Sequence, residues 1–172
     1  MKFKEHADRM GVACKTATVT AVIDQGQSKT VETADGTAYE AKTLILATGA
    51  EHAALHVPGE EQYKGRGVSY CATCDGAFFK GRDVAVVGGG DVAVEDAVYL
   101  ARMCGKVYLI HRRDSLRAAR SLQKKLMDCD NVKILWDRTL SKITGSDLVE
   151  RITLQSVTDQ TEEELPVEGV FI

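Results

Sequence analysis

The 172-residue sequence has no apolar run approaching the roughly 20 residues that a membrane-spanning helix needs. Its first six residues, MKFKEH, carry charges where a secretory signal would carry its apolar stretch. Lysine and arginine number 22 against 25 aspartates and glutamates, so the broad positive field that attracts nucleic acid is missing. These absences predict a cytoplasmic protein that binds neither a membrane nor nucleic acid.

The sequence also lacks the ligand set of a structural zinc site. Its five cysteines include one Cys-x-x-Cys pair, Cys71 and Cys74, and neither a second pair nor a spaced pair of histidines completes four ligands. Recruiting Cys104 and Cys129 from helical positions is the less favoured alternative. We therefore predict no metal site, and we interpret Cys14, Cys104 and Cys129 as small hydrophobic residues.

The pair Cys71 and Cys74 is interpreted as a redox dithiol. Two cysteines at this spacing can close a short disulfide, and helix N–H groups or a nearby cation can stabilise the first cysteine as the attacking thiolate. Asp75 follows directly and is a candidate proton donor or acceptor. In a chain with few, scattered cysteines, such a pair is more typical of catalysis than of a disulfide framework.

Strands and helices alternate in the second half of the chain. Apolar runs at 84–87, 107–110 and 132–136 predict strands, and apolar residues spaced by three and four predict helices between them, the second over 115–128. This βαβαβ order implies a parallel central sheet with right-handed crossovers, as in half of a doubly wound, Rossmann-like α/β fold. Residues 140–157 predict two antiparallel strands.

The first part of the chain is expected to be rich in β-strand. A helix over 1–10, a strand over 13–23 and a hairpin turn at 34–36 are expected, because Asp-Gly in that turn tolerates positive φ. The apolar run 43–47 predicts a strand buried on both faces. The polar, turn-rich segment 51–67 then suits a linker between two units.

A glycine turn joins the strand at 84–87 to the next helix. Gly88, Gly90 and Ala93 fit the pattern G-x-G-x-x-A in the strand–turn–helix context that the pattern requires. Glycine lets the backbone approach a pyrophosphate, and the free N–H groups of the helix N-terminus stabilise its charge. A glycine turn without a ligand is less favoured because of the flanking βαβ unit, so we predict a dinucleotide site.

The residues after the next strand indicate which dinucleotide binds. An acidic residue there would hold the ribose 2′-hydroxyl of NAD, whereas this chain has His111, Arg112 and Arg113, followed by Arg117. Guanidinium groups bind a 2′-phosphate in a forked geometry and have no comparable role for a hydroxyl. NADPH is therefore the predicted nucleotide. The alternative is a solvated basic helix start, with Asp114 as its N-cap or as an arginine partner.

Together these segments resemble the low-molecular-weight, bacterial-type thioredoxin reductases. The matching motifs are SYCATCDG at 69–76, VVGGGDVAVEDA at 86–97 and HRRD at 111–114, in the order and spacing of that family. LATGA at 46–50 resembles its pyridine-nucleotide disulfide reductase signature near the flavin, and PGE at 58–60 its interdomain linker. The resemblance covers nearly the whole chain.

The resemblance implies a flavoenzyme, homodimeric when full length, in which an NADPH domain is inserted into an FAD domain. Electrons would pass from NADPH to FAD, then to the Cys71/Cys74 disulfide and on to thioredoxin. Cys71 would attack the thioredoxin disulfide, Cys74 would lie nearer the flavin, and Asp75 would be the acid that serves the dithiol.

The resemblance also implies the cofactor contacts. Thr48 and Gly49 would lie near FAD. Val92 stands where the family usually has a serine, so only its backbone N–H would reach the pyrophosphate. The residues implied to contact NADPH are Gly88, Gly90, Asp91, Val92, His111, Arg112, Arg113 and Arg117.

Relative to that family, we expect both flavin-binding ends to be absent from this chain, since no G-x-G-x-x-G occurs near the start of the sequence and it stops at residue 172, where the family continues to a second FAD contact region. We expect residues 1–64 to be the middle of an FAD domain, 65–168 to be the NADPH domain, and 169–172 to begin the return into the FAD domain. Such a fragment is expected to bind NADPH without turning over alone. Two alternatives remain, a related flavoprotein that reduces a peroxiredoxin and an NADPH-binding module with a regulatory dithiol.

Overall fold

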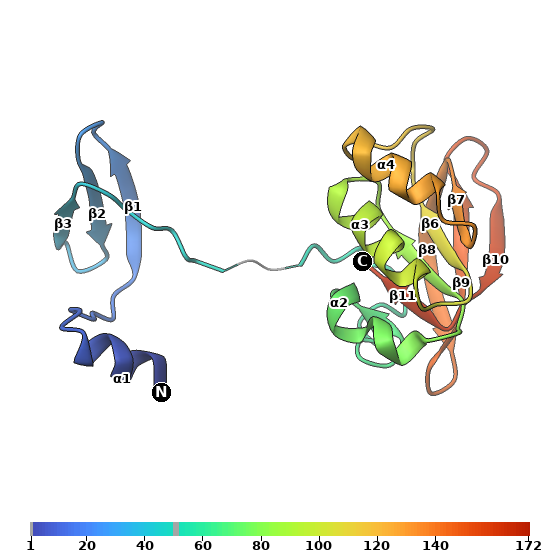
Figure 1. Cartoon of the computed structure of the whole chain (residues 1–172), viewed down its shortest axis with the longest axis horizontal. Coiled ribbons are helices and arrows are strands. Elements are labelled where there is room, and N and C mark those ends of the chain that lie inside the picture. Colours follow the sequence, from blue (N-terminus) through green and yellow to red (C-terminus); the bar gives the residue numbers. More distant parts are fainter. Residues whose placement is uncertain (1, 50–51) are drawn as a thin grey trace. The chain divides into compact units, whose positions relative to one another are not determined.

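The computed structural model describes residues 2–49 and 52–172. The chain divides into two compact units, Met1–Ala50 and Glu51–Ile172 (Figure 1). The first is mainly antiparallel sheet and the second combines helices with a parallel sheet, as the sequence predicts. None of the helices in the described residues is long and apolar enough to cross a bilayer.

In its described residues, the first unit contains one helix and a three-stranded antiparallel sheet in the order β1-β2-β3. Its elements are α1 (Lys2–Arg9), β1 (Val19–Asp24), β2 (Lys29–Thr33) and β3 (Ala38–Ala41). In the turn between β2 and β3, the backbone N–H of Thr33 donates to the carbonyl of Thr37 at 3.0 Å and Gly36 has a φ of 81°. The predicted helix and hairpin are confirmed, whereas the strand predicted from residue 13 begins only at Val19.

The buried strand predicted at residues 43–47 is wrong. The structure gives this segment no strand, and the side chains of Ile45 and Leu46 are 90% and 69% exposed. An apolar run becomes a strand only where neighbouring strands satisfy its backbone N–H and C=O groups. Within the described residues, β1, β2 and β3 pair with one another and none of them pairs with residues 43–47.

The second unit is built on a five-stranded parallel sheet in the order β4-β11-β5-β6-β7. Its strands are β4 (Val68–Ser69), β5 (Val84–Val87), β6 (Val107–Ile110), β7 (Val132–Leu135) and β11 (Gly169–Phe171). The three strands predicted from apolar runs are confirmed as β5, β6 and β7. Residues 169–171, expected to begin the return into the FAD domain, form β11 inside this sheet.

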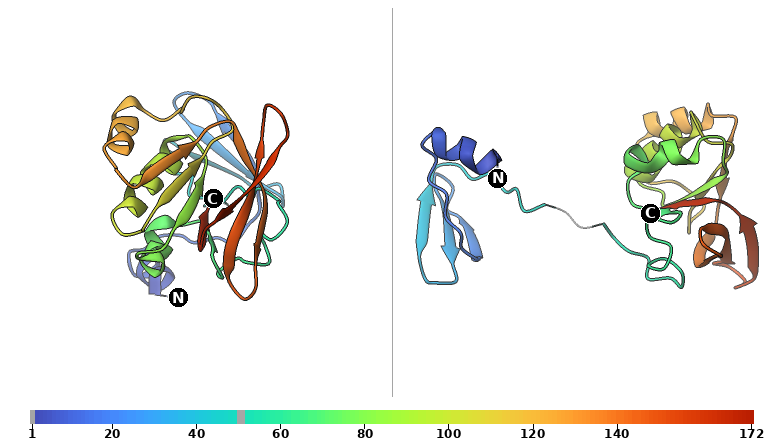
Figure 2. Two further views of the ribbon diagram at one scale, coloured as in Figure 1. Left: turned by 90° about the vertical axis from the view of Figure 1, so that its right-hand side faces the viewer. Right: turned by 90° about the horizontal axis from the view of Figure 1, so that it is seen from below.

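Helices cover one face of this sheet and a second, antiparallel sheet covers the other (Figure 2, left). Successive side chains of a strand point to opposite faces, so Val84 and Val86 pack under the helices while Ala85 packs on the second sheet. The covering elements are α2 (Ala72–Asp75), the 3₁₀ turn Gly76–Phe79, α3 (Asp91–Ala101), α4 (Arg120–Met127), β8 (Arg138–Gly145), β9 (Val149–Ser156) and β10 (Glu162–Pro166).

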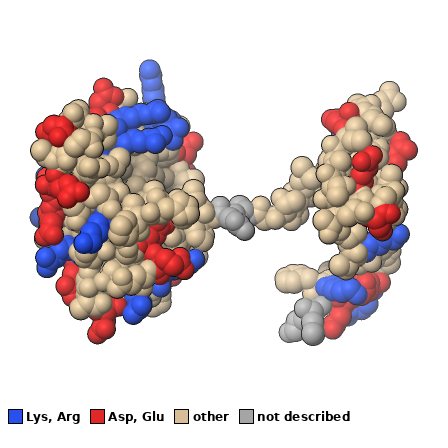
Figure 3. Space-filling model, turned by 180° about the vertical axis from the view of Figure 1, so that it is seen from behind, with Lys and Arg blue, Asp and Glu red and all other residues tan. Residues whose placement is uncertain are grey.

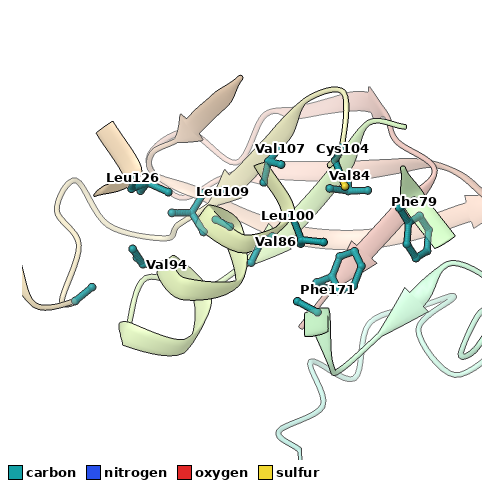
Figure 4. Packing of buried hydrophobic residues seen from close by; sticks show 13 residues of the cluster. Phe79, Val84, Val86, Val94, Leu100, Cys104, Val107, Leu109, Leu126 and Phe171 are labelled. Atoms are coloured by element: carbon teal, nitrogen blue, oxygen red, sulfur yellow. The ribbon is translucent and has the colours of Figure 1, made fainter. Parts of the chain in front are cut away.

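The helix-side core follows from the apolar spacing of α3. Val94, Ala97 and Leu100 of α3 are fully buried, and Figure 4 shows Val94 and Leu100 among the strand side chains Val86 and Leu109. The helix predicted over 115–128 is shorter than expected, because α4 begins at residue 120. The preceding residues bond to the glycine turn instead of to the helix.

The segment expected to be a linker is fixed to the second unit. The backbone N–H of Ile143 donates to the carbonyl of Pro58 at 2.9 Å, and the Tyr63 hydroxyl donates to the carbonyl of Gly145 at 2.6 Å. A Cβ on Gly59, whose φ is +90°, would collide with the Ile143 carbonyl. Residues 52–64 therefore pack with the unit that carries the predicted nucleotide and dithiol residues.

Glu60 anchors this segment through a buried carboxylate, and the residue is only 4% exposed. It accepts hydrogen bonds from the N–H groups of Leu55 and Val57 at 3.1 and 3.3 Å, and from the Tyr70 hydroxyl at 2.6 Å. Burial raises the pKa of Glu60, but the Tyr70 hydroxyl and the backbone donors outweigh it, so the pKa is lowered. Burial and the Glu60 charge raise the pKa of Tyr70 to about 12.

We expect Glu60→Ala to lower the free energy of unfolding of the second unit by about 2–4 kcal/mol, because it leaves buried donors without an acceptor. Glu60 keeps its charge to lower pH in the folded chain than in the unfolded chain. The loss of unfolding free energy in Glu60→Ala should therefore have its full size above about pH 4.5 and become smaller as the pH falls through the folded-state pKa of Glu60. Urea unfolding at several pH values measures it. Glu61→Ala, at an exposed neighbour, is the control, and an equal effect of the two changes would contradict the prediction.

Candidate functional site

A hollow of about 530 Å³ lies at the carboxyl ends of β5 and β6. Ligands of open parallel sheets bind outside these ends, which is where the sequence predicts the nucleotide. The hollow is bounded by the segment before Glu60, by the turns after β5 and β6 and by the start of β8. Its lining includes Leu55, Val57, Gly88, Gly89, His111, Arg112 and Arg117.

The three glycines of the turn after β5 meet different constraints. Gly88 has a φ of +147°, and a Cβ there would lie 2.6 Å from the Cβ of Ala93. A Cβ on Gly89 would run into the ring of His111. Gly90 has a φ of −91°, and a Cβ there would meet nothing within 4 Å. Packing therefore explains Gly88 and Gly89, while at Gly90 the protein leaves open the space that an approaching ligand would use.

The turn leads into α3, whose N-terminus faces the same end of the sheet. The first N–H groups of a helix have no intrahelical acceptor, and they carry the positive end of the helix dipole. Gly90 is the N-cap residue and makes no side-chain cap, and Val92 in the first turn is 72% exposed. An anion at this terminus would therefore meet backbone N–H groups without a competing side-chain acceptor from the cap residue.

The ring of His111 packs against the glycine turn at Gly89. The residue is 5% exposed, and its Nε2 lies 3.0 Å from the carbonyl oxygen of Ser115, which can only accept, so Nε2 carries the proton. Burial lowers the pKa of His111 and the charges of the nearby arginines lower it further, against the opposing hydrogen bond to Ser115. A neutral imidazole packed under Gly89 supports the cradle by its shape; it does not add positive charge.

The structure brings two of the three predicted arginines to the hollow. Arg112 and Arg117 line it, whereas Arg113 is exposed outside it. Within the described residues, none of the three lies within 4.0 Å of a carboxylate. Asp114 accepts a hydrogen bond from Ser115 and is not the N-cap of α4, so neither role considered for it is found. Basic side chains gather along the upper edge of the second unit in Figure 3.

The dithiol follows β4. Cys71 and Cys74 form a disulfide, so in this state their sulfur atoms are not available as zinc ligands. Cys71 is the N-cap residue of α2, and its Sγ accepts a hydrogen bond from the N–H of Cys74 at 3.2 Å. Cys71 is half-buried and Cys74 is exposed. Once the disulfide is reduced, the same N–H would favour the thiolate form of Cys71.

Asp75 is connected to Cys71 through Ser69. The Ser69 hydroxyl donates to Oδ2 of Asp75 at 2.7 Å and accepts from the backbone N–H of Cys71 at 3.1 Å. Ser69 is buried and was given no role from the sequence, although it stands two residues before Cys71. A serine so close to a Cys-x-x-Cys-Asp motif is the signal that could have identified it.

The order of strands places the two sites at one edge. β4, β11 and β5 are parallel neighbours, so the residues after β4 and after β5 emerge at the same edge of the sheet. Strands lie about 4.8 Å apart, which puts the ends of β4 and β5 about 10 Å apart. The dithiol and the nucleotide hollow are thus neighbours, although 12 residues separate Cys74 from Val87.

Thr48 and Gly49 belong to the first unit. Both are exposed in a segment without regular structure, and Gly49 has a φ of +77° with open space around it. Ala50, the last residue of the signature quoted above, lies outside the described residues. The described residues of this unit do not form a cradle around Thr48 and Gly49.

Comparisons with known proteins agree with this geometry. Residues 2–172 match the family model described as "Pyridine nucleotide-disulphide oxidoreductase". The chain is 46% identical to a thioredoxin reductase of Listeria innocua, over 99% of this chain and 54% of that protein. It is 41% identical to a bifunctional thioredoxin reductase/thioredoxin of Mycobacterium leprae, over 98% of this chain and 37% of that protein.

Solved structures give the same result. The thioredoxin reductase of Lactococcus lactis superposes with a TM-score of 0.76 at 39% identity, over 100% of this chain and 57% of that one. The chain spans about half the length of the curated relatives it matches. Its resemblance to thioredoxin reductases is confirmed, and the chain belongs to the pyridine nucleotide-disulphide oxidoreductase family.

Proposed function

We propose that the protein to which this sequence belongs is an NADPH-dependent thioredoxin-disulfide reductase. The observation that carries the proposal is the shared sheet edge, where a hollow lined by two arginines, neither of them paired with a carboxylate among the described residues, lies at the same edge as a Cys-x-x-Cys disulfide. The names of the relatives support the substrate. In this proposal the second unit is the NADPH domain and the first unit is part of an FAD domain.

NADPH, when bound, supplies a hydride. The N–H groups at the start of α3 hold its pyrophosphate, and the open space at Gly90 lets the backbone come close to it. Arg112 and Arg117 bind the 2′-phosphate through charge-assisted hydrogen bonds, and Arg113 adds positive charge from outside the hollow. Neutral His111 keeps the turn in shape beneath Gly89.

The reduced dithiol transfers two electrons by thiol–disulfide exchange. The Cys71 thiolate attacks one sulfur of the thioredoxin disulfide, which forms a mixed disulfide and releases the other sulfur as a thiolate that takes up a proton. Cys74 then attacks Cys71, so the intramolecular disulfide re-forms and thioredoxin leaves as a dithiol. Asp75, held by Ser69, is the carboxyl that exchanges protons with the pair.

The remaining assignments belong to the whole protein. We assign FAD as its second cofactor, a homodimer as its assembly and the cytoplasm, where thiols are kept reduced, as its location. The described residues around Thr48 and Gly49 do not form a flavin site by themselves, so no step is derived through FAD. The 172-residue chain accordingly binds NADPH and does not turn over alone.

Gly90→Ala should weaken NADPH and NADH alike, by more than about tenfold, because a methyl group would occupy the space that the pyrophosphate needs. Its φ of −91° suits alanine, so the free energy of unfolding should change by less than about 0.5 kcal/mol. Calorimetric titration and urea unfolding measure the two effects. Gly89→Ala, where the added Cβ meets His111, should instead destabilise the unit. Unchanged affinity in Gly90→Ala would argue against a pyrophosphate at this turn.

Arg112→Ala and Arg117→Ala should each weaken NADPH by about tenfold or more and leave NADH nearly unchanged, because each removes a charge-assisted bond to the 2′-phosphate. Arg113→Ala should have a smaller effect, since this residue lies outside the hollow. Titration of each variant with both nucleotides tests this. The matched control is Arg102→Ala, an exposed arginine at the other end of α3. Equal binding of NADPH and NADH by the unmodified chain would remove the NADPH assignment.

The two cysteines should behave differently with oxidised bacterial thioredoxin after the chain has been reduced with dithiothreitol and desalted. The unmodified chain should reduce at most one equivalent of thioredoxin. Cys74→Ser should accumulate a covalent 1:1 complex, because the resolving thiol is missing, and Cys71→Ser should give neither product. Intact mass and non-reducing electrophoresis detect these species. A complex formed by Cys71→Ser and not by Cys74→Ser would reverse the two roles.

A further inference from the structure

The loop that carries the predicted 2′-phosphate arginines is bonded to the glycine turn. The backbone N–H groups of Arg117 and Ala118 donate to the carbonyl of Gly89 at 2.8 and 3.2 Å. The next N–H, of Ala119, donates to Oδ1 of Asp91 at 2.8 Å. In the described residues, Asp91 is the one side chain of α3 that bonds to this loop.

The Asp91 carboxylate lies where two helices begin. Asp91 is the first residue of α3, and its partner Ala119 is the N-cap residue of α4, which has no capping side chain of its own. A negative charge near a helix N-terminus is stabilised by the dipole, here of both helices. One carboxylate thus ties the start of α4 to the nucleotide cradle.

A direct contact with the nucleotide does not explain an aspartate at this position. A carboxylate beside a pyrophosphate is a like-charge neighbour, and it reduces the positive potential that the helix N-terminus offers. The hydrogen bond to Ala119 gives the side chain a different task, which is to fix the end of the loop that begins at Arg112 and includes Arg117. Arginine side chains bind a phosphate most tightly when their backbone is already held in the bound position.

We infer that Asp91 is a positioning residue for nucleotide selectivity: through Ala119 it holds the arginine loop beside the hollow, so that the chain distinguishes NADPH from NADH. This inference rests on the proposed NADPH site. A positioning role and a direct pyrophosphate contact of Asp91 have different consequences. In the positioning role, loss of the hydrogen bond lowers the preference for NADPH over NADH more than it lowers the binding common to both dinucleotides.

The test is calorimetric titration of the full 172-residue chain with NADPH and with NADH, with the ratio of the two dissociation constants as the readout. Asp91→Ala removes the acceptor, and the ratio should fall by about tenfold. Asp91→Asn keeps an oxygen that can accept from Ala119 and loses the charge, so it should stay within about threefold of the unmodified ratio.

The donor side supplies an independent pair of variants. Ala119→Pro removes the N–H and leaves the Asp91 charge in place, and the φ of −56° at this residue suits proline. It should lower the ratio as Asp91→Ala does, and the double change should lower it no further, because both act on one bond. Ala119→Gly keeps the N–H and is the matched control. Circular dichroism of each variant verifies that the unit is folded.

The inference is overturned if Asp91→Ala keeps the unmodified ratio, if Asp91→Asn falls as far as Asp91→Ala, or if the effects of Asp91→Ala and Ala119→Pro simply add. These results differ from a failure of the proposed function. If the unmodified chain binds NADPH no better than NADH, the NADPH assignment fails and the inference falls with it. If the unmodified chain prefers NADPH and Asp91→Ala prefers it equally, only the role of Asp91 is wrong.

Discussion

Parallel pairing of β4, β11 and β5 is the constraint on which the arrangement of the sites depends. In a parallel sheet every strand ends at the same edge, so the segments that follow β4, β5 and β6 must emerge together. The disulfide follows the first of these strands, the glycine turn the second and the arginines the third. β11, which lies between β4 and β5, sets their separation. Because β11 pairs with β4 on one side and with β5 on the other, this strand of only three residues is required for the arrangement of the site.

Much of this arrangement could be predicted from local sequence pattern. Short β-branched runs separated by helical periodicity identify β5, α3 and β6, and glycines next to such a strand identify the turn. The predictions that were wrong or absent depend on parts of the chain that are distant in sequence. Residues 43–47 have the composition of a buried strand, but their exposure is decided by which strands lie beside them. β11 is too short to be recognised alone, and the chain direction by which it enters the sheet is a tertiary property.

The supporting roles of three polar residues were not predicted, for a related reason. Ser69, Glu60 and the carboxylate of Asp91 act through partners that are between 2 and 28 residues away in sequence. A carboxylate in a turn-rich segment is ordinarily a solvated surface residue, and nothing near Glu60 in the sequence indicates that Tyr70 will cover it. His111 is a further case. The resemblance implies a nucleotide contact, and the structure adds that the ring lines the hollow and packs against Gly89, where burial lowers its pKa.

Glu60 also joins the hollow to the dithiol. Its N–H donors, Leu55 and Val57, line the nucleotide hollow, and its third donor, Tyr70, is the residue before Cys71. A buried carboxylate with three donors is costly to separate from any one of them, since the lost partner leaves an unsatisfied charge in a dry environment. The same carboxylate therefore bonds both to the wall of the hollow and to the residue that precedes the disulfide.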